Sequence, residues 1–341
     1  MRIAIVNDSL IAVESLRRVI AAAPEHEVAW LAYNGVEAVE HCARDTPNLI
    51  LMDLIMPMMD GVAATRHIMA HTPCAILVIT ATVQGNGAKV FDAMGAGALD
   101  AINTPILGMD GQGNGKEDLL RKITNIGRLM NGGNRFGTRR TEATPTKDAN
   151  NGTCLLAIGA STGGPAAVVS LLAGLPDKFQ GAVLLAQHMD EQFLSSFAEW
   201  LSTQCKMPVR VAQPGERPTP GVVLVAGTKD HLILRSDGTL GYTSDPVDYP
   251  FRPSVNAFFE SIAAQWQGPA LGVLLTGMGK DGANGLLAMR NKGHHTIAQD
   301  KASCAVYGMP RAAVELGAAK EVLGLDQIAV SISSAFAKIG K

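Results

Sequence analysis

The stretch CLLAIGASTGGPAAVVSLLAGL, residues 154–175, decides the fold of the second half of the chain. Its first part, 154–159, is a short apolar run of the kind that forms a buried parallel strand. A glycine-rich turn follows at 159–164, and 165–175 then has the spacing of a helix that begins with proline. Strand, tight turn and helix in this order predict a doubly wound, mainly parallel α/β domain.

Ser161 lies in a G-x-S-x-G pattern between this strand and this helix. Glycines beside a serine allow a sharp turn that exposes its hydroxyl above the sheet, as in the nucleophile elbow of hydrolases. Backbone N–H groups at the start of the next helix point to the same place and suit a developing oxyanion. A phosphate-binding turn is the alternative, but the stretch lacks lysine and matches neither G-x-G-x-x-G nor a Walker loop.

Two further apolar runs lead into residues that could complete a serine-based site. The run 182–187 leads into His188, and 270–277 leads into a glycine-rich turn with Asp281. Because the carboxyl ends of parallel strands meet at one sheet edge, both side chains are expected near Ser161. There histidine would act as the base and aspartate would fix its tautomer.

Three other aspartates compete for the acid role, but none follows a strand so directly: Asp190, Asp230 and Asp300. The chain order Ser, His, Asp differs from the Ser, Asp, His order of α/β-hydrolases, which indicates an independent use of the triad. Elsewhere in this half, 232–243 is expected to form a hairpin around Asp237-Gly238, and 309–316 has helical spacing.

Residues 1–131 have the pattern of five strand–helix repeats, which predicts a flavodoxin-like (βα)5 domain with a parallel sheet. The expected strands are 3–6, 28–33, 48–52, 75–80 and 98–103, and a helix over 117–130 closes the domain. Residues 132–152 are rich in Gly, Asn and Thr and nearly devoid of apolar side chains, so they are interpreted as a flexible linker. The second domain is then 153–341.

Polar residues stand at three strand ends of the first domain: Asp8, Asp53 and Thr80. Two carboxylates at one sheet edge suit a hard divalent cation with oxygen ligands. The alternative is that each aspartate only caps the helix that follows it, but the matching positions of all three residues make that explanation weaker.

The first domain resembles the receiver domain of two-component response regulators. The resemblance rests on ND at 7–8, LMDLIMPMMDG at 51–61, ITA at 79–81 and TP at 104–105. It implies that Asp53 is the phosphoacceptor and that Thr80 senses the phosphoryl group. It further implies that Asp8, Asp53 and the backbone carbonyl of Ile55 bind Mg²⁺.

Two positions depart from the receiver pattern. Asn7 stands where receivers usually carry a second acidic residue, and Thr104 stands where they usually carry lysine before the proline. Loss of the ammonium group removes a charge-assisted contact to the phosphoryl oxygens. We therefore expect a weaker coupling of phosphorylation to conformation, and a receiver that works without phosphate is the alternative.

The whole chain resembles the CheB family, the chemotaxis protein-glutamate methylesterases with a receiver, a linker and an esterase domain. The matching strings are GASTGGP at 159–165, AQHM at 186–189, FRPSV at 251–255, LLTGMGKDGANG at 274–285 and AQDKASCAVYGMP at 298–310. Within that family, the IVND start and the TP at 104–105 look most like the WspF type of the Wsp surface-sensing pathway.

This resemblance implies a triad of Ser161, His188 and Asp281, an oxyanion hole near the N–H of Thr162, and Met278 beside the histidine. The implied substrates are methylated glutamates on cytoplasmic helices of methyl-accepting chemoreceptors, which release methanol, and receptor glutamines, which release ammonia. A chemosensory histidine kinase is the implied phosphodonor. The resemblance also implies that the receiver restrains the esterase, and that the esterase domain needs no cofactor.

Composition agrees with a cytoplasmic enzyme. The 341 residues carry a formal net charge of −2, which disfavours general binding to nucleic acid. No uncharged run is long enough to insert in a membrane, and the five cysteines form no C-x-x-C pair. Two other functions stay open: a response regulator with a non-catalytic, partner-binding output, and a serine esterase of small molecules.

Overall fold

The computed structural model describes residues 1–80, 83–105, 115–130, 153–249 and 251–339. The chain divides into two compact units, Met1–Arg135 and Phe136–Lys341, which are described separately. The predicted linker 132–152 lies outside the described residues. Among the described helices, none combines the length and the apolar character that crossing a membrane requires.

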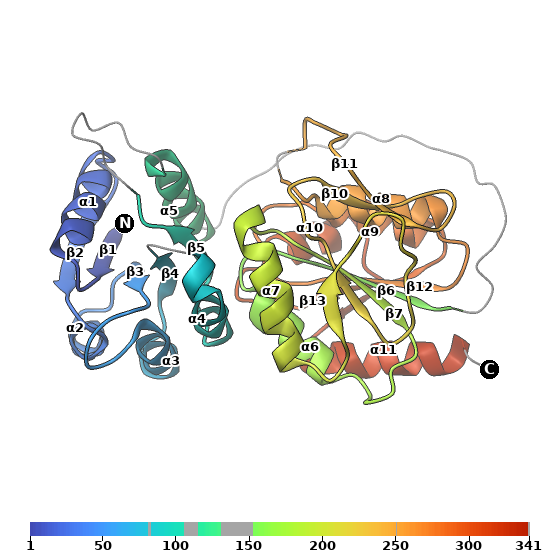
Figure 1. Ribbon diagram of the computed structural model, residues 1–341, viewed down its shortest axis with the longest axis horizontal. Helices are drawn as coiled ribbons and strands as arrows, with labels where there is room; N and C mark the ends of the chain where they lie inside the picture. Colours follow the sequence, from blue (N-terminus) through green and yellow to red (C-terminus); the bar gives the residue numbers. More distant parts are fainter. Residues whose placement is uncertain (81–82, 106–114, 131–152, 250, 340–341) are drawn as a thin grey trace. The chain divides into compact units, whose positions relative to one another are not determined.

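The first unit is a five-stranded parallel sheet in the order β2-β1-β3-β4-β5 (Figure 1). This is the strand order of flavodoxin-like folds, so the predicted fold class is confirmed. Helices α1 and α5 contact each other, and α2, α3 and α4 form a second contacting group. The elements are β1 (Arg2–Val6), α1 (Leu10–Ala21), β2 (Glu27–Ala32), α2 (Gly35–Arg44), β3 (Leu49–Asp53), α3 (Gly61–His71), β4 (Ala75–Thr80), α4 (Val83–Gly95), β5 (Asp100–Asn103) and α5 (Lys116–Met130).

The second unit is built on a seven-stranded sheet in the order β14-β13-β12-β6-β7-β9-β8, and every pair in it is parallel. A separate antiparallel hairpin pairs β10 with β11. The elements are β6 (Leu155–Ala160), α6 (Gly164–Ala173), β7 (Ala182–Gln187), α7 (Glu191–Gln204), β8 (Val209–Val211), β9 (Val223–Val225), β10 (His231–Leu234), β11 (Leu240–Thr243), α8 (Val255–Gln265), β12 (Ala270–Leu274), α9 (Ala283–Asn291), β13 (His295–Gln299), α10 (Met309–Glu315), β14 (Glu321–Leu323) and α11 (Leu325–Ile339).

Strand β6 lies at the point where the strand order reverses. The chain passes from β6 to its neighbour β7 on one side and later returns to β12 on the other side. All residues of these three strands are buried, as their continuous apolar runs predict. In doubly wound sheets, ligands bind beyond the carboxyl ends of the strands at such a switch point.

Strand β12 is shorter than the predicted 270–277, because it ends at Leu274. The backbone N–H of Thr276 donates to the side-chain Oε1 of Gln299 at 2.8 Å instead of to a strand carbonyl. Gly277 then forms an isolated bridge with Tyr307. A side-chain acceptor therefore replaces the ladder on the β13 side, while the carbonyl of Thr276 still accepts from the N–H of Ser161 at 3.0 Å.

Candidate active site

Ser161, His188 and Asp281 come from the three adjacent central strands. Ser161 directly follows β6, His188 directly follows β7, and Asp281 lies in the turn between β12 and α9. The turn after Ser161 depends on glycine, because Gly163 has φ of 74° and a Cβ there would lie 2.5 Å from the Cβ of Ala305. The sequence pattern thus brings all three predicted residues to one edge of the sheet.

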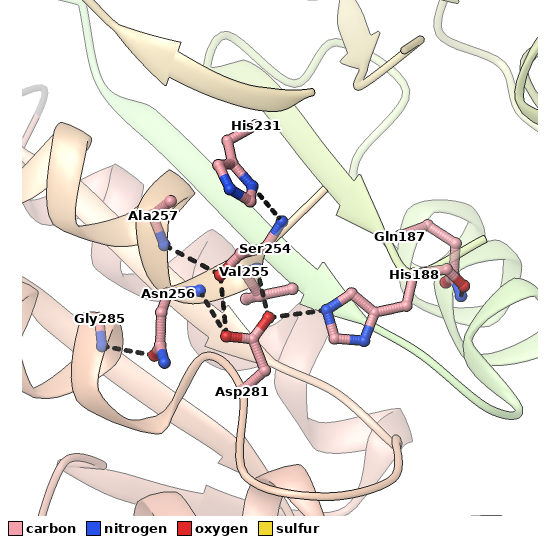
Figure 2. Close-up of polar contacts among 9 residues, drawn as sticks. All are labelled: Gln187, His188, His231, Ser254, Val255, Asn256, Ala257, Asp281 and Gly285. Carbon is pink, nitrogen blue, oxygen red and sulfur yellow. Dashed lines mark hydrogen bonds and ion pairs between the residues drawn. The ribbon is translucent and has the colours of Figure 1, made fainter. Parts of the chain in front are cut away.

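The imidazole of His188 points to Asp281, and its Nε2 lies 2.7 Å from Oδ2 of the carboxylate (Figure 2). The His188 side chain is 7% exposed. Its Nδ1 is buried and has no hydrogen-bond partner among the described residues. Because an ionised carboxylate accepts from Nε2–H, the neutral ring keeps its free lone pair on Nδ1. Nδ1 is therefore the nitrogen that can take up a proton.

Asp281 is also held by the N-terminus of α8 (Figure 2). Its carboxylate accepts from the backbone N–H of Val255 at 2.6 Å and of Asn256 at 3.2 Å. The hydroxyl of Ser254 donates a further bond at 2.9 Å. Negative charge is favoured at a helix N-terminus because the helix dipole and free N–H groups point there.

Burial raises the pKa of Asp281, but the bonds from His188, Val255 and Ser254 together with the charge of His188 outweigh it. The net result is a pKa below the usual value for aspartate. The carboxylate is therefore kept ionised next to the imidazole, which is the state that fixes a histidine tautomer.

Two ring side chains support this arrangement, and neither role was predicted from the sequence. The ring of Phe251 stacks on His188 with centroids 4.5 Å apart and planes 9° apart. His231 is fully buried, and its Nδ1 accepts from the backbone N–H of Ser254 at 2.9 Å. His231 thus holds the residue that caps α8 and donates to Asp281, while Nε2 lies 3.3 Å from the carbonyl of Pro246.

The three competing aspartates have other partners. Asp190 caps α7 by accepting from the N–H of Gln192. Asp230 lies 3.9 Å from Arg252, and Asp300 accepts from the N–H and hydroxyl of Ser303. Asp281 is the candidate acid that contacts a histidine.

The backbone around Thr162 suits an oxyanion. The N–H of Thr162 shares its peptide unit with the carbonyl of Ser161, which accepts from the N–H of Gly164 at 2.7 Å. The N–H of Thr162 donates to no group in the part of the chain that is described. Met278 lies half-buried in the turn that leads to Asp281. Its predicted place beside the histidine stays a prediction.

In the first unit, Asp53 ends β3 and Asp8 follows β1, its neighbour in the sheet. Burial raises the pKa of Asp53, the N–H groups of Leu54 and Ile55 lower it, and the charge of Asp8 raises it again, so that the net shift is upward. Two mutually repelling carboxylates fit a hard divalent cation, which would relieve their repulsion. Ile55 is exposed in the adjoining loop.

Two other polar residues of this edge are tied into the fold. The side-chain oxygen of Asn7 accepts from the N–H of Ser9 at 2.8 Å, so Asn7 supports the chain before α1. Thr80 ends β4 and is 1% exposed, and its carbonyl accepts from the N–H of Thr104. Thr104 therefore follows β5 next to the predicted switch residue, where it brings no positive charge.

Fold and site together define a class of protein: a receiver-type domain joined to a parallel α/β domain with a serine, histidine and aspartate at its switch point. A family model described as CheB methylesterase matches residues 156–332, and one described as response regulator receiver domain matches residues 3–109. The chain belongs to the CheB methylesterase family.

Relatives match over nearly the whole chain. A protein-glutamate methylesterase/protein-glutamine glutaminase of Pseudomonas aeruginosa is 52% identical over 98% of this chain and 100% of its own length. One from Cupriavidus metallidurans is 55% identical over 96% of both chains. The crystal structure of the Thermotoga maritima CheB methylesterase catalytic domain is 32% identical, with a TM-score of 0.52, over 54% of this chain and 99% of that chain. These names carry no pathway, so the resemblance to the WspF type stays a prediction.

Proposed function

We propose that this chain is a protein-glutamate methylesterase and protein-glutamine deamidase whose triad is Ser161, His188 and Asp281. One observation carries the proposal: Asp281 binds Nε2 of His188 and leaves the buried Nδ1 free, at the end of the strand next to the one that Ser161 follows. The names of the relatives support the same activity. The substrates would be methylated glutamates and glutamines on cytoplasmic helices of chemoreceptors.

In the first half of the reaction, Nδ1 of His188 takes the proton of the Ser161 hydroxyl as Oγ attacks the ester carbonyl. The carbonyl π electrons move onto oxygen, and the N–H of Thr162 would stabilise that oxyanion. When the intermediate collapses, His188 returns the proton to the leaving oxygen. Methanol departs and leaves an acyl-enzyme.

In the second half, His188 takes a proton from water while the water oxygen attacks the acyl carbon. Collapse of this intermediate breaks the bond to Oγ, returns the proton to Ser161 and releases the glutamate side chain. Deamidation of glutamine follows the same steps with ammonia as the leaving group. Asp281 stays ionised throughout and stabilises the imidazolium that forms twice.

For the receiver, we propose that Asp53 accepts a phosphoryl group from a chemosensory histidine kinase. Asp8, Asp53 and the backbone carbonyl of Ile55 would hold Mg²⁺, which supplies positive charge to the phosphoryl oxygens when bound. Thr80 would sense the group through its hydroxyl. The esterase domain would need no cofactor, because the triad supplies both nucleophile and base.

Substrate class is tested by offering the purified chain methylated receptor, receptor that retains glutamine, and soluble acyl esters. We expect methanol from methylated chemoreceptor and ammonia from a receptor that retains glutamine, with little hydrolysis of soluble acyl esters. Fast hydrolysis of small esters without methanol from receptor would instead identify an esterase of small molecules. Failure on every ester, by a chain that still binds receptor, would identify a partner-binding output.

A further inference from the structure

Gln187 contacts the backbone of both the proposed nucleophile and the proposed base. It is the last residue of β7 and is 2% exposed. Its Nε2 donates to the carbonyl of Ser161 at 2.8 Å and to the carbonyl of His188 at 3.0 Å. Figure 2 shows that Gln187 leaves the same strand end as His188, whose ring points to Asp281. A single side-chain amide therefore links the two backbones.

The amide acts where the ladder between β6 and β7 stops. The last backbone bond of this pair runs from the N–H of His188 to the carbonyl of Ala160 at 2.9 Å. Beyond it both strands have ended. The Nε2 of Gln187 then bonds to the first carbonyl after each strand, that of Ser161 and that of His188. The carbonyl of Ser161 also accepts from the N–H of Gly164 at 2.7 Å. An amide oxygen turned toward two carbonyl oxygens would repel both, so the NH₂ group must face them and the amide cannot be flipped.

This orientation leaves Oε1 of Gln187 buried without a partner among the described residues. A buried acceptor without a donor destabilises a fold. The helix that follows Ser161 accommodates the amide only because residue 164 is glycine, since a Cβ there would lie 2.1 Å from Oε1. A buried polar atom without a partner, next to reactive groups, is typical of a site where function outweighs stability.

We propose that Gln187 is a positioning residue that sets the separation between Oγ of Ser161 and Nδ1 of His188. The inference rests on the proposed esterase function and extends it to a residue without direct contact to the reacting atoms. Proton transfer requires these two atoms within hydrogen-bond distance, and a misplacement of about 1 Å costs roughly 10²-fold in rate.

Two replacements separate positioning from packing. Gln187→Met has a similar volume but donates no hydrogen bond. Gln187→Glu keeps the shape but places a carboxyl against two carbonyl oxygens, so only its protonated form donates. The matched control is Thr296→Val, which removes a buried hydroxyl that donates to the carbonyl of Ala318 at 2.8 Å and lies on β13 at the opposite end from the triad.

The variants are compared by kcat and KM for methyl ester hydrolysis, and by the rate at which Ser161 reacts with a serine-directed phosphonate, followed by intact mass. Gln187→Met should lower kcat and the phosphonate rate by about 10²-fold with KM unchanged. The Glu variant should gain on the Met variant as the pH falls. Thr296→Val should lower the melting temperature and keep kcat within about twofold.

A Met variant within about threefold of the unmodified chain in both rates would overturn the proposal. A Glu variant no faster than the Met variant at any pH would also overturn it, because a protonated carboxyl restores a hydrogen-bond donor that methionine lacks. The phosphonate reaction keeps this test independent of the substrate. If the chain releases no methanol, the proposed function fails, while the phosphonate rates still decide the role of Gln187.

Discussion

At the scale of single residues, four hydrogen-bond donors hold the carboxylate of Asp281 in place. The imidazole of His188, two backbone N–H groups and the hydroxyl of Ser254 all point to its two oxygens. An amide cannot replace this group, because its NH₂ would face N–H donors and its oxygen alone cannot fix the tautomer of His188. Asp281→Asn should therefore lower kcat by about 10⁴-fold, measured as methanol release per enzyme. Activity within about tenfold of the unmodified chain would show that Asp281 is not the partner of the base.

The same carboxylate predicts a dependence of stability on pH. Because the folded pKa of Asp281 is lowered, its ionised form stabilises the fold above the unfolded value of about 3.9. That stabilisation is lost as the pH falls through the folded pKa. The free energy of unfolding of Asp281→Asn should thus be lower by roughly 3 kcal/mol near neutral pH, and the difference should shrink in acid. Urea unfolding of both chains at several pH values measures it, and a difference that stays constant into acid would contradict the lowered pKa.

The three triad candidates could be predicted from the sequence because each follows an apolar run that ends at the same sheet edge. Gln187, His231 and Ser254 could not be assigned roles in the same way. Their roles depend on hydrogen bonds between segments far apart in the chain, such as the bond from Ser254 to Asp281. The string FRPSV contains Ser254, and a serine directly before an apolar stretch is a sequence signal for the N-cap of a helix.

At the scale of elements, the start of α8 is the structure that fixes the acid. Ser254 caps this helix by accepting from the N–H of Ala257 and donates to Asp281 with the same hydroxyl. Removal of the hydroxyl loses both bonds, so Ser254→Ala should destabilise the protein by about 1–2 kcal/mol and lower kcat. Urea unfolding and methanol release measure the two effects.

Ser254→Thr is the matched variant because it keeps a hydroxyl that can cap and donate. It should retain more stability and more activity than Ser254→Ala. Equal losses in the two variants would mean that the size of the side chain matters here and that the hydroxyl does not.

Element boundaries show where sequence patterns are informative. The buried runs of β4 and β7 match the predicted 75–80 and 182–187, because continuous apolar strands leave a clear signal. The predicted end of β12 lies three residues too far, since Leu275, Thr276 and Gly277 are buried without lying in a strand. The three-residue strands β8, β9 and β14 are too short for any periodicity to reveal.

At the scale of the whole molecule, the chain combines a receiver with an esterase, and the receiver departs from its pattern at Asn7 and Thr104. The oxygen of Asn7 is engaged by the N–H of Ser9, and Thr104 brings no cation to the phosphoacceptor edge. Phosphorylation of Asp53 should therefore switch the enzyme less strongly than a receiver with lysine at position 104 would.

Removal of residues 1–140 should raise esterase activity, because the family resemblance implies that the receiver restrains the esterase. The Thermotoga maritima relative was solved as a catalytic domain alone, which supports the choice of boundary.

Acetyl phosphate with Mg²⁺ should raise the activity of the full chain modestly and leave the activity of Asp53→Asn unchanged. Methanol release measures both the effect of removing residues 1–140 and the response to acetyl phosphate. An isolated esterase domain no faster than the full chain would refute restraint, and a response of Asp53→Asn equal to that of the unmodified chain would exclude Asp53 as the switch.

The central claim is that Ser161 is the nucleophile of a receptor methylesterase, and methanol release by Ser161→Ala from methylated chemoreceptor tests it most directly. The account predicts a folded protein, with an unchanged melting temperature, whose activity is lower by about 10⁴–10⁶-fold. Loss of a single oxygen should do this, because the acyl-enzyme can no longer form. Methanol release within about tenfold of the unmodified chain would contradict the account.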